Sequence, residues 1–246
     1  MARRAVRRTS RQQPIGPLER RNLDAGAADS IRRLIFNRHF PTGAHIVEAN
    51  LAAALGVSHG TVRAALQQLR HEGLVEYRPN RGIFVKRLES RDAWEVYTLR
   101  NTLEAMAARL AAERVTDTAR QELRAILEQM RKAVQKGDRA GAIRSDFEFH
   151  RLVMRLSGHR LLQRNYRLLE LQTRLFMALT DVLHTNLSHF LPLHEPLIDS
   201  IAAGDPDRAE ALASQHNNPD GERLIRHMEH VEVESHAVLS DLSSST

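Results

Sequence analysis

The chain has 246 residues, of which 42% are hydrophobic, and its formal net charge is +6. This size allows two modest domains with real cores, and the positive charge favours a polyanionic partner. The absence of cysteine excludes disulfides and thiolate metal sites. No apolar run is long enough to cross a membrane, and no apolar segment follows the N-terminal arginines as in a secretory signal. We therefore expect a cytoplasmic protein.

The first segment is rich in arginine. Residues 1–15 carry little apolar sequence, and we predict a disordered basic arm that adds salt-sensitive phosphate contacts or has no specific role. Residues 17–40 then place apolar side chains near helical spacing, which predicts a supporting helix ended by Pro41-Thr42-Gly43. The arginines of the arm are Arg3, Arg4, Arg7, Arg8 and Arg11.

Residues 48–73 have the pattern of two short helices joined by a tight turn. Gly56-Val57 breaks the first helix, and Ser58 stands where the N-cap of the second belongs. Leu51, Ala54 and Leu55 give the first helix its apolar spacing. The second helix has an apolar stripe of Val62, Ala65, Leu66 and Leu69. Its opposite, outward face carries His59, Gly60, Arg63 and Gln67.

The period then becomes strand-like. Residues 74–77 and 83–85 flank a turn, residues 78–82, which carries the cations Arg78 and Arg81. Helix, turn, helix and basic hairpin together predict a winged helix-turn-helix. Such a head places one helix in the major groove of DNA and its hairpin on phosphates or the minor groove. The alternative is a helical hairpin that happens to precede a β-hairpin.

The stretch LAAALGVSHGTVRAALQQLRHEGLVEYRPNRGIFV resembles the N-terminal domain of the GntR family of bacterial transcription regulators. The usual form there is LA-x-x-LGVSR-x-PVREAL-x-x-L-x-x-EGLV followed by a wing that ends in RG. His59 and Thr61 replace the family's common Arg and Pro, so the operator sequence does not carry over. Arg63 matches a base- or phosphate-contacting arginine. The resemblance implies DNA contacts from Ser58, His59, Thr61, Arg63, Gln67, Arg78, Arg81 and Gly82.

The rest of the chain has a helical pattern. We place the domain boundary near residue 89, so that residues 16–88 form the winged helix-turn-helix and 89–232 an all-α domain. Residues 233–246 are Ser-rich and polar, and we expect a disordered tail. The fold class is thus mainly α with one small β-hairpin. The first helix of the all-α domain, over 92–112, is expected to bury Val96, Leu99, Leu103, Ala107 and Leu110.

Four residues of this all-α domain have the spacing of a metal site. Asp146 and His150 are one helical turn apart on one face. His194 precedes Gly204-Asp205 by ten residues and His216 follows it by eleven, so a helical hairpin with that tip places both at matching height, about 15 Å from it. One carboxylate and three imidazoles suit Zn²⁺, Ni²⁺, Mn²⁺ or Fe²⁺. Alternatively, these are ordinary surface or capping histidines among the thirteen in the chain.

Residues 92–216 resemble the FCD ligand-binding domain of the FadR-type branch of GntR regulators. The matching motifs are Leu99-Arg100-x-x-Leu103-Glu104, the DFEFHRLV segment with Asp146 and His150, and Ser157-Gly158-His159. His194-x-x-x-Ile198-x-x-Ile201-x-x-Gly204-Asp205 and His216 complete the set. The resemblance implies that Asp146, His150, His194 and His216 bind a divalent metal that helps hold a small carboxylate effector. It also implies that Arg100 faces this cavity and pairs with a carboxylate; the alternative is a surface ion pair with Glu104.

Prolines interrupt this pattern close to two of the expected ligands. Pro192 and Pro196 flank His194, and Pro219 follows shortly after His216. Interior prolines distort helices, and such a distortion would displace either ligand and weaken metal binding. The nearby histidines that would then substitute are His184, His189, His227 and His230.

Together these patterns predict a one-component transcription regulator. A homodimer would bind a roughly palindromic operator, and a small organic acid at the metal would change the affinity for it. The resemblance to the family favours a repressor over an activator. The first alternative is a metal-dependent hydrolase or lyase, although no further general base stands out. The second is a regulator that senses the metal itself.

Overall fold

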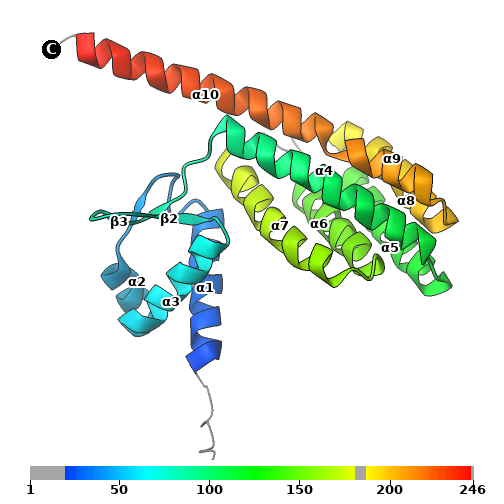
Figure 1. The fold of residues 1–246 in the computed structure, drawn as a ribbon, viewed down its shortest axis with the longest axis horizontal. Coiled ribbons are helices and arrows are strands. Elements are labelled where there is room, and N and C mark those ends of the chain that lie inside the picture. Colours follow the sequence, from blue (N-terminus) through cyan, green and yellow to red (C-terminus); the bar gives the residue numbers. More distant parts are fainter. Residues whose placement is uncertain (1–19, 181–186, 245–246) are drawn as a thin grey trace, which may run out of the picture.

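The computed structural model describes residues 20–180 and 187–244. Figure 1 shows an N-terminal head of helices and a small sheet beside a larger body of helices. The fold class predicted from the sequence is confirmed. The elements of the head are α1 (Arg20–Phe36), β1 (His45–Ile46), α2 (Glu48–Leu55), α3 (His59–His71), β2 (Val75–Arg78) and β3 (Gly82–Val85).

The helix-turn-helix forms where its capping signals stand. Gly56 ends α2 with a φ of 64°, a left-handed conformation that glycine adopts without strain. The hydroxyl of Ser58 then accepts the backbone N–H of Thr61 at 3.1 Å and caps α3. The predicted apolar stripe of α3 is buried in the head core. On α2, however, Ala52 is buried and Ala54 is exposed.

The wing is the outer hairpin of a three-stranded antiparallel sheet with the order β1-β3-β2. The hairpin β2–β3 was predicted from the sequence, whereas the two-residue strand β1 was not. On this sheet the rings of His45 and Phe84 lie 4.8 Å apart. A side chain at Gly82, where φ is 95°, would collide with the imidazole of His45. Gly82 therefore lets the wing close over β1.

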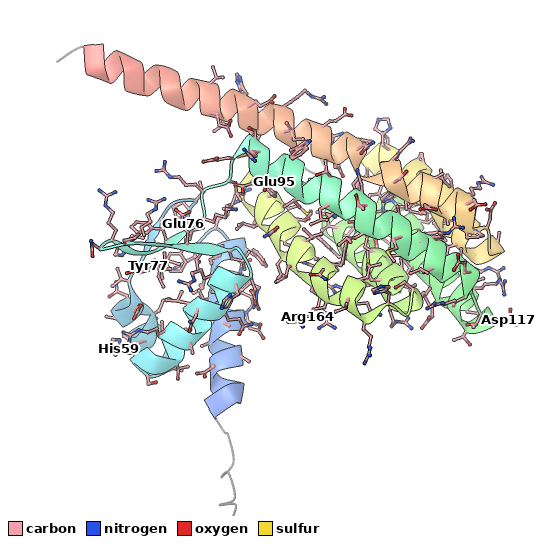
Figure 2. All side chains as sticks on the ribbon, in the orientation of Figure 1. His59, Glu76, Tyr77, Glu95, Asp117 and Arg164 are labelled. Carbon is pink, nitrogen blue, oxygen red and sulfur yellow. The ribbon has the colours of Figure 1, made fainter. Side chains whose placement is uncertain are left out.

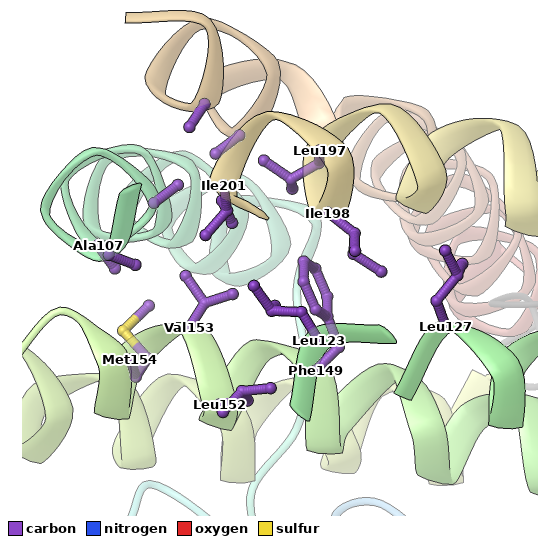
Figure 3. Packing of buried hydrophobic residues seen from close by; sticks show 14 of the residues in the cluster. Ala107, Leu123, Leu127, Phe149, Leu152, Val153, Met154, Leu197, Ile198 and Ile201 are labelled. Carbon is purple, nitrogen blue, oxygen red and sulfur yellow. The ribbon is translucent and has the colours of Figure 1, made fainter. Parts of the chain in front are cut away.

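Seven α-helices and a short 3₁₀ helix make up the described part of the body. Its largest apolar cluster lies where α5, α6 and α8 meet α4, with Phe149 and Leu123 at its centre (Figure 3). No helix of the described residues is long and apolar enough to span a membrane. The elements are α4 (Ser90–Glu113), α5 (Asp117–Gln135), α6 (Arg139–Leu156), α7 (Arg160–Thr180), η1 (Leu187–His189), α8 (Phe190–Ala203), α9 (Pro206–His216) and α10 (Asn218–Ser244).

Two expectations about the body differ from the structure. Leu99, expected inside, is 48% exposed, while Arg100 and Glu104 are buried, because α4 turns its charged pair towards the cluster described below. The segment expected to be a disordered tail from residue 233 continues α10 to Ser244. No glycine or proline follows Gly221 to end that helix. The predicted basic arm lies outside the described residues.

Helix α7 belongs to the body but also completes the core of the head. Leu175 is fully buried among the apolar residues of the head, and Leu171 and Leu179 pack against the same cluster. These three leucines recur every fourth residue and so share one face of α7. The guanidinium of Arg38, just after α1, also donates to the carbonyl of Ala178 near the end of α7. The head is therefore packed onto the body.

Candidate functional site

Four side chains from three helices converge in the body. Asp146 and His150 project from adjacent turns of α6, His194 comes from α8 and His216 from the last residue of α9. All four are buried, and one potential ligand atom of each lies within 4.8 Å of the others. The helical hairpin α8–α9 turns at Gly204 (φ 75°) and Asp205, as the spacing predicted. The structure therefore brings together the four residues that the sequence singled out.

The prolines do not separate these ligands. Pro192 is the third residue of α8, where its missing N–H would have no partner within the helix. Pro196 lies inside α8, yet the helix continues to Ala203 and keeps His194 in the cluster. Pro219 is the second residue of α10, so the helix break falls just after His216. Of the substitute histidines, His184 lies outside the described residues, and the others do not join the cluster.

His194 is oriented for a ligand on its outer nitrogen. Its Nδ1 lies 2.7 Å from the carbonyl oxygen of Phe190. A carbonyl only accepts hydrogen bonds, so Nδ1 must carry a proton. In neutral imidazole Nε2 then presents a lone pair to the carboxylate oxygen of Asp146, which is 2.8 Å away. Two acceptors face each other at this distance only with a cation or a proton beside them, and this arrangement fits a metal site.

His150 is held in the same way by a buried carboxylate. Its Nδ1 lies 3.2 Å from Oε2 of Glu104, and its Nε2 lies 3.4 Å from Oδ1 of Asp146. A carboxylate behind a metal-binding histidine fixes the ring and raises its basicity. Oε2 of Glu104 also accepts a hydrogen bond from the amide of Asn217 at 2.7 Å. Glu104 and Asn217 thus support the site from α4 and the α9–α10 joint.

Charge is distributed unevenly over the histidines of the cluster. Burial lowers the pKa of His150, but the carboxylates of Glu104 and Asp146 outweigh it and raise the pKa to about 9. Burial, with His194 and His150 nearby, holds the pKa of His216 well below its usual range. His216 is therefore neutral and ready to bind a cation, whereas His150 must first give up a proton.

A cavity of about 340 Å³ opens beside the cluster, within the size range of small-molecule sites. Asp146, His194 and His216 form part of its wall. Arg100 also lines it, as expected, but forms a buried ion pair with Glu104 rather than the surface pair given as the alternative. The remaining lining residues are Tyr97, His189, Phe190, Pro192, Leu193, Asn217, Pro219, Asp220 and Arg223.

The second candidate surface lies on the head. His59, Arg63 and Gln67 are exposed on α3, and Figure 2 shows His59 on its outer side. The guanidinium of Arg63, whose side chain is 72% exposed, lies 3.2 Å from the carboxylate of Glu48 on α2. Arg63 thus stands on the accessible face with one weak surface partner.

The two predicted wing arginines differ in their exposure and in their contacts with neighbouring side chains. Arg81 is exposed at the hairpin turn. Arg78, in contrast, donates to Glu76 at 2.5 Å and stacks over the ring of Phe84 at 4.4 Å. Neither this stacking nor the role of Asn217 was predictable from sequence patterns, because both depend on contacts between separate elements. Tyr77, exposed on the same hairpin (Figure 2), was not singled out either.

The winged head and the separate helical body, with its buried imidazole–carboxylate cluster and adjoining cavity, define a two-domain DNA-binding regulator. Residues 23–85 match the model of the bacterial regulatory proteins of the gntR family, and residues 95–218 match the FCD domain. The chain belongs to the GntR family and carries an FCD domain.

Curated relatives and solved structures agree with this assignment. The chain is 34% identical over 201 residues to a probable D-xylose utilization operon transcriptional repressor of Paenarthrobacter nicotinovorans, covering 81% of this chain and 87% of the relative. It is 28% identical to the transcriptional repressor NanR of Cronobacter sakazakii, with coverage of 82% and 85%. A GntR regulator structure from Rhodococcus sp. RHA1 aligns with a TM-score of 0.68 and 25% identity, covering 83% of this chain and 98% of that one. The protein is thus a transcriptional regulator of the GntR/FCD type, a class whose relatives here include repressors.

Proposed function

We propose that the protein is a repressor whose operator affinity is set by a small organic acid bound at a metal in the FCD domain. The observation that carries this proposal is the buried convergence of Asp146, His150, His194 and His216 beside a cavity. Their N₃O donor set suits Zn²⁺, Ni²⁺, Mn²⁺ or Fe²⁺. The bound metal would supply positive charge for a carboxylate, and the residues would fix where that charge lies.

We infer that the working form is a homodimer in the cytoplasm, where bacterial operators are found. Large apolar side chains are exposed on the neighbouring helices α4 and α7, namely Leu99, Leu161 and Leu168. Exposed apolar side chains of this kind are typical of protein interfaces. A symmetric pair of heads would bind a roughly palindromic operator. The effector would control binding by favouring one arrangement of the heads over the other.

A substitution on α3 tests the proposed operator binding. Duplexes selected from a random pool by the wild-type chain provide the operator probe. Arg63→Ala should weaken binding by about 1–3 kcal/mol if its guanidinium makes a bidentate base contact. Fluorescence anisotropy measures the affinity. The salt concentration is held fixed, because the contribution of phosphate contacts to DNA affinity depends on salt.

The matched control is Arg124→Ala, an exposed arginine on α5 of the body, which should leave the affinity unchanged. Equal affinities of the wild type and Arg63→Ala would overturn the role of Arg63. If no duplex were enriched by the wild-type chain, the proposed operator binding would fail as a whole.

A further inference from the structure

The arginine expected to receive the effector is already engaged. Nε and Nη2 of Arg100 lie 3.1 and 3.0 Å from Oε1 of Glu104, and Nη1 donates to Thr173 at 3.4 Å. Both side chains of the ion pair are only 4% exposed. Diverting Arg100 to a ligand would leave the carboxylate of Glu104 buried without its cation, which is costly. Because Glu104 also orients His150, Arg100 acts as a positioning residue for the metal cluster.

A second arginine lines the same cavity from α10. Arg223 lies on the wall that also includes Asp146, His194 and His216. Its side chain is 37% exposed, and its ion pair with Asp220, three residues earlier, has an N–O distance of 3.4 Å. A partly exposed pair at this distance contributes little. The guanidinium of Arg223 can therefore turn to a ligand at low cost, unlike that of Arg100.

Two separate positive centres therefore border one cavity. The first is the proposed metal, which the buried cluster would hold, and the second is Arg223. Arginine binds a carboxylate through two parallel hydrogen bonds, which fixes both position and direction. A monoacid offers a single acidic group to these two centres, whereas a diacid offers one acidic group to each.

We propose that Arg223 binds a second anionic group of the effector, so that the regulator recognises an organic acid with two acidic groups rather than a monoacid. This inference rests on the proposed metal-dependent effector site and specifies its ligand. One acidic group lies at the metal and the other at Arg223. The ligand also contacts α10 directly through Arg223.

The test uses two probes that differ by one carboxylate. Malate and lactate share the α-hydroxycarboxylate that chelates a divalent metal, but only malate has a second carboxylate. Calorimetric titration of the metal-loaded full-length chain should show malate binding at least about tenfold more tightly, the usual effect of a charge-assisted hydrogen bond. Arg223→Gln should reduce malate affinity to that of lactate and leave lactate affinity unchanged.

Arg226→Gln is the matched control, since Arg226 lies on the same helix, is 67% exposed and pairs with Glu222 away from the cavity lining. It should bind both acids as the wild type does. Malate affinity unchanged in Arg223→Gln would overturn the proposal, and so would a wild type that binds both acids equally or neither.

Metal content and operator affinity are measured on the same preparations. A chain without metal would mean that the proposed function itself fails. If the chain binds metal and operator but Arg223→Gln leaves the malate affinity unchanged, only this inference fails.

Discussion

At the residue scale, the cluster is set up so that a metal competes with a proton. Glu104 and Asp146 raise the pKa of His150 to about 9, although burial opposes them. The ordinary pKa of histidine is about 6.5. In the metal-free chain His150 is therefore protonated at pH 7 and is bound to two carboxylates. This ion cluster satisfies the charges that the metal would otherwise neutralise.

Metal uptake at pH 7 should release about one proton from His150, since the ligand form of imidazole is neutral. Calorimetric titration with Zn²⁺ in buffers of different ionisation enthalpy measures that proton. The observed enthalpy should change with the buffer at pH 7, and the affinity should rise towards pH 9. A buffer-independent enthalpy at pH 7 would contradict the protonated state of His150.

The raised pKa of His150 also determines whether stability rises or falls with pH. Because the folded pKa lies above the unfolded one, the contribution of His150 is complete below about pH 6.5 and is lost as the pH rises through about 9. The metal-free chain should thus lose thermal stability over this interval. The metal-loaded chain serves as the control and should not show this loss, because its His150 is already neutral.

At the element scale, the sequence predicted individual helices better than the faces they bury. Capping residues are local signals, so Ser58 marked the start of α3 correctly. The burial of Arg100 and Glu104 was not predictable from periodicity, because it depends on His150 and Asn217 on other elements. Strand β1 was not predicted for a similar reason, because a two-residue strand is defined only by its pairing with β3.

Residue spacing predicted the buried cluster for a geometric reason. A helical turn and a hairpin tip both convert sequence separation into position, which placed Asp146 beside His150 and His194 level with His216. Arg223 has no such relation to the ligands along the sequence. Its place in the cavity follows from the packing of α10 on α4, where Gly221 lies against the ring of Tyr97.

Helix α7 supplies an element-scale prediction. Leu175→Ala should lower the free energy of unfolding by about 2–5 kcal/mol, because it leaves a cavity where this helix completes the head core. Urea unfolding followed by circular dichroism measures the change. Arg164→Ala, at an exposed position of the same helix (Figure 2), should change stability by less than about 0.5 kcal/mol. Equal stabilities of these two variants would show that the packing of α7 in the head core does not contribute to stability.

At the scale of the whole molecule, α10 links the cavity to the connection between head and body. Its first turns border the cavity with Asp220 and Arg223. Further along, the carboxylate of Glu232 accepts hydrogen bonds from the backbone and hydroxyl of Ser90, at 2.6 and 3.0 Å. Ser90 begins α4 directly after the connection, and Lys86 of that connection pairs with Asp92 at 2.7 Å. These contacts join α10 physically to the segment that connects head and body.

A metal in the buried cluster is central to the proposed function. Elemental analysis of the full-length chain, purified without a histidine tag, tests for this metal most directly. Asp146→Ala is measured beside the wild type, and operator binding of both confirms that the head is intact. We expect about one divalent metal ion per wild-type chain and a marked loss of metal in the variant. A wild type without metal, or equal metal content in the two proteins, would contradict it.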